Sequence, residues 1–255
     1  LVKAGALLKL DDYAEALQLA DTTLDDVKAA NVEGAIDAAT IDGSLYAFPR
    51  AADNGYFLYY DSSVISEEDA ASWDSLLEAA DKAGKKVGMT LASGNLVACV
   101  SGTWDAITAQ DVFGDGYAAT KLPTFTVGDK QVQQGSVAGY KYVGVNGYSE
   151  NSGWAVLLAE YLTNEESQQM FFDQRESGPS NKNVAASDSV QENVALAALS
   201  AQSEYAQAQK VGGKYWDSAQ TFGELVAQGT LSADDDNAIQ EALDNLVDGV
   251  TAPVE

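Results

Sequence analysis

Hydrophobic and polar positions recur along the chain with two different spacings, one typical of helices and the other of strands. Apolar side chains three and four residues apart predict amphipathic helices, at Asp11–Leu19, Trp73–Lys82 and Trp154–Leu162. Short apolar runs predict strands, at Ser44–Pro49, Tyr56–Tyr60, Val87–Leu91, Val97–Val100 and Tyr142–Val145. The chain after Asn164 is predicted to be helical, with segments through Phe172 and at Val194–Gln209, Trp216–Gln228 and Ala233–Val247. Strands that alternate with helices indicate an α/β architecture.

Polar residues in front of these runs mark where the helices begin. Side-chain oxygens accept hydrogen bonds from the first free amides of a helix, which predicts N-caps at Thr22 or Thr23, Ser66, Ser72, Asn164 and Ser232. Asp42-Gly43 predicts a hairpin turn, and Gly84 and Gly229 predict helix ends. The acidic run at 234–236 could suggest a calcium loop. It lacks the glycine and distal glutamate of an EF-hand, which favours a charged helix start.

The charge balance limits the partners that this chain can have. The chain has 255 residues, 14 basic and 39 acidic, and a formal net charge of −25, while 46% of its residues are hydrophobic. That apolar share is typical of a folded protein with one large or two ordinary domains. A surface this acidic repels phosphate backbones and anionic lipids, so nucleic acid is not an expected partner and contact with a membrane would be peripheral. High solubility is the simplest consequence of the charge.

Two residue types that carry much of enzyme chemistry are almost absent. The chain has no histidine and a single cysteine, Cys99. This excludes a Ser-His-Asp triad, histidine-ligated zinc and an intramolecular disulfide. Cys99 lies in the apolar run Leu96–Val100, which predicts a small buried hydrophobe. No cofactor and no metal are expected.

The sequence contains no recognisable targeting signal or membrane-spanning segment. No run of eighteen apolar residues is present, and no signal peptide is visible. The chain opens on Leu1 rather than methionine, which suggests a mature, trimmed or incomplete chain.

The most informative segment is Ala98–Ala106, in which Trp104 follows Ser101, Gly102 and Thr103 at the end of a predicted strand. Glycine allows the backbone to approach a ligand closely, and a tryptophan there can present a flat apolar face. The local spacing alone favours a buried core tryptophan. The rest of the chain favours ligand contact.

Several separated segments occur in the order found in the sugar-binding proteins of bacterial ABC importers. They are Asp42–Pro49, Leu58–Asp61, Ser72–Leu76, Ser101–Trp104 with Leu122–Phe125, Trp154–Met170, and Tyr215–Gly229. Each is weak alone, but their joint order covers nearly the whole chain. The chain therefore resembles that family, and in particular its maltodextrin-binding branch.

The resemblance implies a two-lobe periplasmic-binding-protein fold of type II with hinge crossovers. The expected first lobe comprises residues 1–53 and 143–190, and the expected second lobe comprises 54–142 and 191–255. The family has an additional strand-rich segment in the first lobe and a long stretch where this chain has only Asn95–Val100. The chain is therefore expected to lack parts of both lobes, with the ligand contacts that they carry.

The resemblance also implies site residues, each with an alternative. Trp104 and Trp216 match tryptophans that stack on sugar rings, and Trp216 could instead pack in a helical core. Asp53 matches an acidic residue in the first crossover, or is a solvated hinge acid. Arg50 and Asn54, in the same segment, could bind sugar hydroxyls or brace the hinge.

The remaining implied positions depart further from the family pattern. Tyr140 lies near the second crossover and could instead be an ordinary strand-end tyrosine. Asp217 and Gln220 stand where the maltose-binding relatives have a tyrosine and an arginine, which puts the contact pattern in doubt. Trp73 belongs to a motif that is structural in the family.

The implied function is binding rather than catalysis. The resemblance implies a monomeric, extracytoplasmic protein, either a lipoprotein or periplasmic. It would capture maltose or maltooligosaccharides and deliver them to the permease of an ABC transporter. The alternatives are a binder of another oligosaccharide, a carbohydrate-active hydrolase, and a binding protein reused as a scaffold. A hydrolase would not need histidine, but no carboxylate pair near Trp104 forms a recognisable catalytic motif.

Overall fold

The computed structural model of the chain describes residues 1–209, 213–232 and 234–252. Contacts along the backbone divide the chain into a first unit, Leu1–Ala208, and a second unit, Gln209–Glu255. The predicted lobe boundaries lie mostly within the first unit and stay a prediction. No helix among the described residues is long and apolar enough to cross a membrane.

The N-terminal part of the first unit is a set of short helices around a hairpin. The helices are η1 (Val2–Ala4) and η2 (Leu10–Ala20), both 3₁₀, followed by α1 (Leu24–Ala30) and α2 (Glu33–Ala39). Thr23 caps α1 as predicted, through a capping box with Asp26. The hairpin of β1 (Thr40–Ile41) and β2 (Ser44–Leu45) turns at Asp42 and Gly43, whose φ angles of 51° and 80° suit the predicted turn.

The first predicted helix is present but has a different geometry. η2 is a 3₁₀ helix that departs from helical angles at Tyr13. Leu10 and Leu17 on it are fully buried, as its apolar spacing requires. The Asp11 carboxylate accepts a hydrogen bond from the Leu45 amide, 2.8 Å away. This bond ties the start of the helix to the hairpin, which explains why the tertiary contact takes precedence over α-helical geometry.

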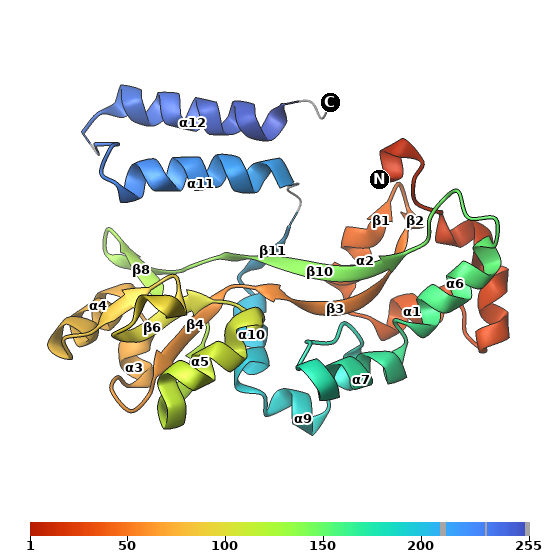
Figure 1. The fold of residues 1–255 in the computed structure, drawn as a ribbon, viewed down its shortest axis with the longest axis horizontal. Helices are drawn as coiled ribbons and strands as arrows, with labels where there is room; N and C mark the ends of the chain where they lie inside the picture. The colour runs from red at the N-terminus through yellow and green to blue at the C-terminus, as the bar shows by residue number, and fades with distance from the viewer. Residues whose placement is uncertain (210–212, 233, 253–255) are drawn as a thin grey trace. The chain divides into compact units, whose positions relative to one another are not determined.

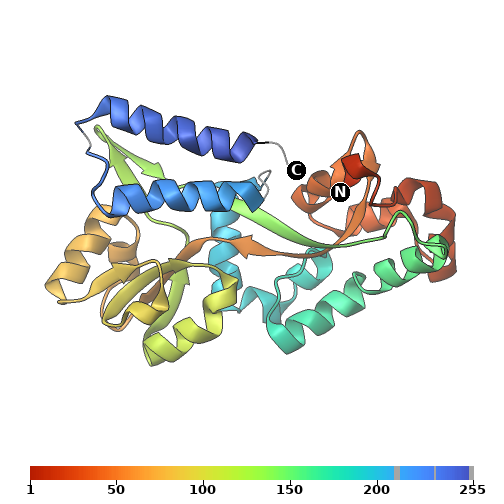
Figure 2. The same ribbon diagram turned by 45° about the horizontal axis from the view of Figure 1, so that its top comes forward.

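Two long antiparallel strands, β3 (Ala47–Gly55) and β10 (Ser136–Gly144), form what we call the crossover ribbon. The strand β11 (Ala206–Ala208) pairs in parallel with the start of β10, giving the order β11-β10-β3. Figures 1 and 2 show the ribbon running from the α1, α2 and α6 region to the β4 and β6 region, with α10 against its middle. Both the early start of β10 and the existence of β11 differ from the prediction.

The helix predicted at Val194–Gln209 ends early, because the residues after it form strand β11 and pair with β10. Helix α10 covers only Val194–Ser203. The Gln202 side chain is fully buried, accepts from the Leu122 amide at 2.8 Å and donates to the Gln134 carbonyl at 3.0 Å. The Tyr205 carbonyl then accepts from the Ser136 amide at 3.1 Å, which starts the pairing with β10.

A four-stranded sheet lies at one end of the ribbon. Its order is β5 (Lys86–Gly88), β6 (Leu96–Ser101), β4 (Phe57–Asp61) and β7 (Tyr117–Thr120). Every residue of β4 and β6 is buried, as their continuous apolar runs predict. Strand β5 is shorter than predicted, and β7 was not predicted. Cys99 on β6 is buried and free, and burial together with Asp105 raises the pKa of its thiol to about 11.

Helices and a hairpin surround this sheet. They are α3 (Glu67–Ala70), α4 (Trp73–Lys82), η3 (Leu91–Ser93), η4 (Thr103–Asp105), α5 (Ala106–Phe113), η5 (Gly114–Gly116) and the pair β8 (Thr124–Val127) and β9 (Lys130–Gln133). Ser66 and Ser72 cap α3 and α4 as predicted. Two hydrophobic clusters cover the two faces of β4, one with Leu58 and Leu76 and the other with Phe57 and Phe113.

Five helices complete the first unit. They are α6 (Ser152–Tyr161), α7 (Glu165–Arg175), α8 (Lys182–Ala185), α9 (Asp188–Gln191) and α10. Asn164 caps α7 as predicted. A separate cluster packs α6 against the N-terminal helices and the start of β3, through Val156, Leu17 and Phe48. The ribbon therefore joins two hydrophobic cores.

The second unit consists of two helices, α11 (Gly213–Ala227) and α12 (Asp236–Thr251). Gly229 adopts a positive φ of 68° after α11, as expected of a helix end. The predicted N-cap of the last helix is wrong. Asp235 caps α12 instead, by accepting from the Ala238 amide at 3.0 Å, and the predicted start at Ala233 lies outside the described residues.

A buried glutamine links several parts of the first core. The Gln168 carbonyl oxygen accepts from the Ser180 and Asn181 amides, both at 2.8 Å. Its amide nitrogen lies 2.6 Å from the Thr163 carbonyl and 3.2 Å from the Pro49 carbonyl. Gln168→Leu removes these bonds and leaves buried backbone groups without partners. We expect the free energy of unfolding to fall by about 2–4 kcal/mol, measured by urea denaturation.

The neighbouring Gln169 provides the control. Its amide bonds only to Asp173 on the exposed side of α7. We expect Gln169→Leu to change the free energy of unfolding by no more than about 0.5 kcal/mol. Equal losses in the two variants would contradict the linking role of Gln168.

Candidate functional site

Trp104 lies in η4, directly after the buried strand β6, and 51% of its surface is exposed. Its ring meets that of Tyr56 at 5.3 Å and at an angle of 85°. The core alternative for this tryptophan is therefore wrong, because half of its surface is open to solvent. Such a ring can receive a flat apolar partner.

Gly102 allows the indole of Trp104 to fold back over the turn. A Cβ at this position would lie 2.2 Å from the Trp104 ring and 2.6 Å from the Gly55 carbonyl oxygen. Only glycine avoids both clashes without movement of the backbone. The small residue in front of the tryptophan therefore has a packing role.

Two hydrogen bonds hold this turn to its surroundings, and a third lies within the turn. The Tyr59 hydroxyl donates to the Gly102 carbonyl at 2.9 Å, and the Thr103 hydroxyl donates to the Asp53 carbonyl at 2.7 Å. The Ser101 hydroxyl donates to the Asp105 carboxylate at 2.5 Å. Burial raises the pKa of Tyr59, which stays a hydrogen-bond donor. The turn that carries Trp104 is thus fixed to the crossover ribbon.

Asp53 is buried, with 3% of its surface exposed. One carboxylate oxygen lies 2.6 Å from Lys141 Nζ, and the other accepts from the Ser177 hydroxyl at 2.8 Å. The alternative of a solvated hinge acid is therefore wrong. The Lys141 side chain is half exposed, so its ammonium is a charged donor that solvent or a ligand can reach.

Arg50 and α7 are joined by a cation–π contact. The Arg50 guanidinium carbon lies 4.4 Å from the centre of the Phe171 ring. Phe171 belongs to α7, so this contact braces the helix against β3. Of the two expectations for Arg50, the brace is the one that the structure displays.

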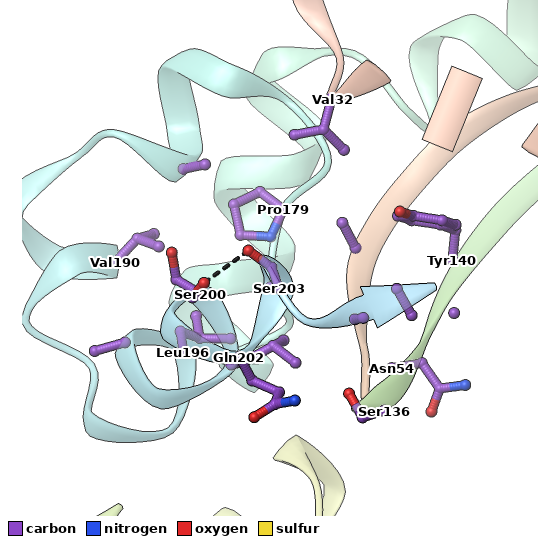
Figure 3. A pocket seen from close by; sticks show the side chains of 18 of the residues that line it. Val32, Asn54, Ser136, Tyr140, Pro179, Val190, Leu196, Ser200, Gln202 and Ser203 are labelled. Carbon is purple, nitrogen blue, oxygen red and sulfur yellow. Dashed lines mark hydrogen bonds between the residues drawn. The ribbon is translucent and has the colours of Figure 1, made fainter. Parts of the chain in front are cut away.

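Asn54 and Tyr140 belong to β3 and β10 and are the sequence neighbours of Asp53 and Lys141. Both line a pocket shared with Pro179 and Leu196 (Figure 3). The Tyr140 ring lies 6.4 Å from that of Tyr142, and burial, aided by Asp37, raises the pKa of its hydroxyl. The structure thus ties the Asp53 backbone to the Trp104 turn and places Asn54 and Tyr140 in the lining of this pocket.

The last three predicted residues lie on α11 in the second unit. Trp216 is 42% exposed and meets Tyr215 at 5.2 Å. The Gln220 amide donates to Glu224, and the Asp217 carbonyl accepts from Thr221, which leaves the Asp217 carboxylate out of that bond. Trp216 and Gln220 are four residues apart and share one face of the helix.

Sequence reasoning missed three residues of the Trp104 cluster. Lys141 and Ser177 join Asp53 from 88 and 124 residues away, so no local pattern points to them. Tyr56 lies within a predicted strand and could have been noticed as the aromatic residue closest to Asp53 in sequence. The described residues contain no cluster of three or more metal-binding side chains.

A family model described as bacterial extracellular solute-binding protein matches residues 3–93 and 88–198. No curated protein matches the chain in sequence. Among solved structures, a maltodextrin-binding protein, MalE1 of L. casei, is 19% identical with a TM-score of 0.79, and the match covers 98% of this chain and 80% of that protein. The GacH receptor of Streptomyces glaucescens, solved without ligand and with acarbose, is 16% identical with a TM-score of 0.75. The match covers 99% of this chain and 81% of that protein.

A third structure, the maltose-bound MalE of Listeria monocytogenes, is 16% identical with a TM-score of 0.74, over 99% of this chain and 81% of that protein. These likenesses show the fold. The chain has the predicted α/β, two-lobe binding-protein fold, over about four fifths of the length of each of these proteins.

The Lys141 ammonium stabilises the buried Asp53 carboxylate. Lys141→Met leaves this carboxylate with Ser177 as its remaining side-chain partner. Because Lys141 is half exposed and partly screened, we expect a loss of about 1–2 kcal/mol in the free energy of unfolding, measured with urea. Lys130→Met, at an exposed position on β9, is the control and should change it by less than about 0.5 kcal/mol. Equal effects would show that the Asp53 pair has no special weight.

Proposed function

The chain belongs to the bacterial extracellular solute-binding family, and on that premise we propose that it captures maltose and maltooligosaccharides for an ABC transporter. The half-exposed Trp104, in a turn that the Thr103 hydroxyl bonds to the Asp53 backbone, is the observation that carries this proposal. Three solved proteins of the same fold add support, since they are described as binding maltodextrin, acarbose or maltose.

The proposed chemistry is stacking combined with hydrogen bonding. One face of a pyranose ring carries mainly C–H groups, which suit the negative face of an indole. Sugar hydroxyls at the ring edge need charged or polar partners, and such bonds are the stronger ones. We assign the stacking to Trp104 and the donation to sugar hydroxyls to the half-exposed Lys141 ammonium. Asp53 would accept from a sugar hydroxyl in place of Lys141 or Ser177, which hold its two oxygens in the structure.

The other proposed contacts have less support. Arg50 is engaged with Phe171, and Asn54 and Tyr140 line a pocket whose lining does not include Trp104. Trp216, Asp217 and Gln220 are supported by the sequence resemblance alone.

The proposed mechanism is binding without chemistry. Sugar contacts that form only when two lobes approach would favour the closed form, a shift in population about the crossovers. The closed monomer would then dock, outside the cytoplasm, on a membrane permease. The acidic surface could pair with basic permease loops.

Tryptophan fluorescence tests the proposal directly. We expect a saturable change with maltose and maltotriose, and no change with xylotriose. Trp104→Ala should abolish the response, because the indole that senses the sugar is removed. Trp154→Ala is the matched control, since Trp154 is 71% exposed on α6 and away from the cluster, and it should keep the titration unchanged.

Three outcomes would contradict parts of the proposal. An unchanged titration in Trp104→Ala would exclude Trp104 as the sensor. A response to xylotriose alone would keep sugar binding and reject the maltodextrin class. Shorter products from maltotriose, detected by chromatography, would support a hydrolase instead.

A further inference from the structure

A second, separate pocket lies against the middle of the crossover ribbon. Its cavity volume is about 270 Å³, and its walls come from β3, β10, β11 and the segment from Gly178 to Ser203 (Figure 3). Asn54 and Ala52 of β3 and residues 136–140 of β10 form one wall. Trp104, Asp53 and Lys141 are not among its lining residues. The pocket is therefore distinct from the proposed sugar site.

The lining of this pocket selects against charged ligands. None of its described lining residues is charged, and most of its wall is made by small or aliphatic side chains, among them Val32, Val137, Pro179, Val190, Leu196 and Leu199. Transfer of an ion into such surroundings is costly. The ligand class that fits is neutral and largely apolar.

One buried polar atom of this wall has no hydrogen-bond partner among the described residues. The Ser136 hydroxyl oxygen is buried and makes no hydrogen bond among the described residues. By contrast, both ends of the Gln202 amide are engaged, and the Ser203 hydroxyl donates to the Ser200 carbonyl. A buried hydroxyl normally has a partner, and leaving one unpaired costs stability. Ser136 therefore marks where a ligand's polar group would sit.

The size of the cavity narrows the ligand further. An apolar cavity of about 150 Å³ is enough to hold benzene, and drug-sized sites begin near 300 Å³. We propose that the pocket is a second ligand site, for a neutral aromatic alcohol of one or two rings. Its hydroxyl bonds Ser136, and its rings pack against Val137, Leu196 and Leu199.

The test uses 2-naphthol as the probe, with its fluorescence excited at wavelengths that tryptophan does not absorb. We expect saturable binding to the full chain, unchanged by maltotriose. Ser136→Ala should weaken binding about three- to tenfold, the usual effect of losing one neutral hydrogen bond. It should not lower the melting temperature of the ligand-free protein, because the hydroxyl it removes has no partner there.

Two controls separate this pocket from other binding. Ala197 lines the pocket but is exposed, so Ala197→Phe should fill the opening and abolish binding while the fold is retained. Ser200→Ala removes an exposed lining hydroxyl and should leave the affinity unchanged. Naphthalene lacks the hydroxyl and should bind the wild type more weakly than 2-naphthol does. Its affinity should be the same for the wild type and for Ser136→Ala.

The proposal is overturned by either of two results. Absence of saturable binding by the folded wild type would reject the site. Equal affinity for 2-naphthol in the wild type, Ser136→Ala and Ala197→Phe would place the probe elsewhere. Neither result bears on sugar binding, which the Trp104 titration measures separately.

Discussion

The antiparallel pairing of β3 with β10 is the constraint on which the rest of the first unit depends. These strands connect a core built on Phe48, Leu17 and Val156 to the clusters around β4. The pairing is irregular between Gly139 and Tyr142, where the register shifts. Such irregularities bend a strand and increase its twist. The ribbon therefore sets both the separation of the two cores and the direction in which its central side chains point.

The same stretch of the ribbon carries two kinds of chemistry. Asp53 meets Lys141 and Ser177, and the Asp53 backbone holds the Trp104 turn. Asn54 and Ser136, from the two paired strands, line a pocket whose described lining has no charged residue. A charged, hydrogen-bonding cluster and an uncharged pocket thus occupy the same stretch of backbone.

Local signals predicted the elements whose stability is local. Thr23, Ser66, Ser72 and Asn164 cap helices because the bonds they make lie within three residues of each cap. Strands β7 and β11 were missed because they are short and rich in alanine, and partners distant in sequence stabilise them. The same division holds for the site. The glycine and tryptophan of the turn were visible in sequence, whereas Lys141 and Ser177 reach Asp53 only through the fold.

The rigidity of the Trp104 turn has a consequence for binding. A side chain that is ordered only when a ligand arrives costs free energy at that moment. Trp104 is already held by the Gly102 close approach, the Tyr56 ring and the bonds from Tyr59 and Thr103. Its exposed surface is therefore preorganised, because the side chain is already ordered in the folded protein before a ligand binds. Because the Thr103 hydroxyl donates to the Asp53 carbonyl, the turn that carries Trp104 is also fixed to the strand that joins the two cores.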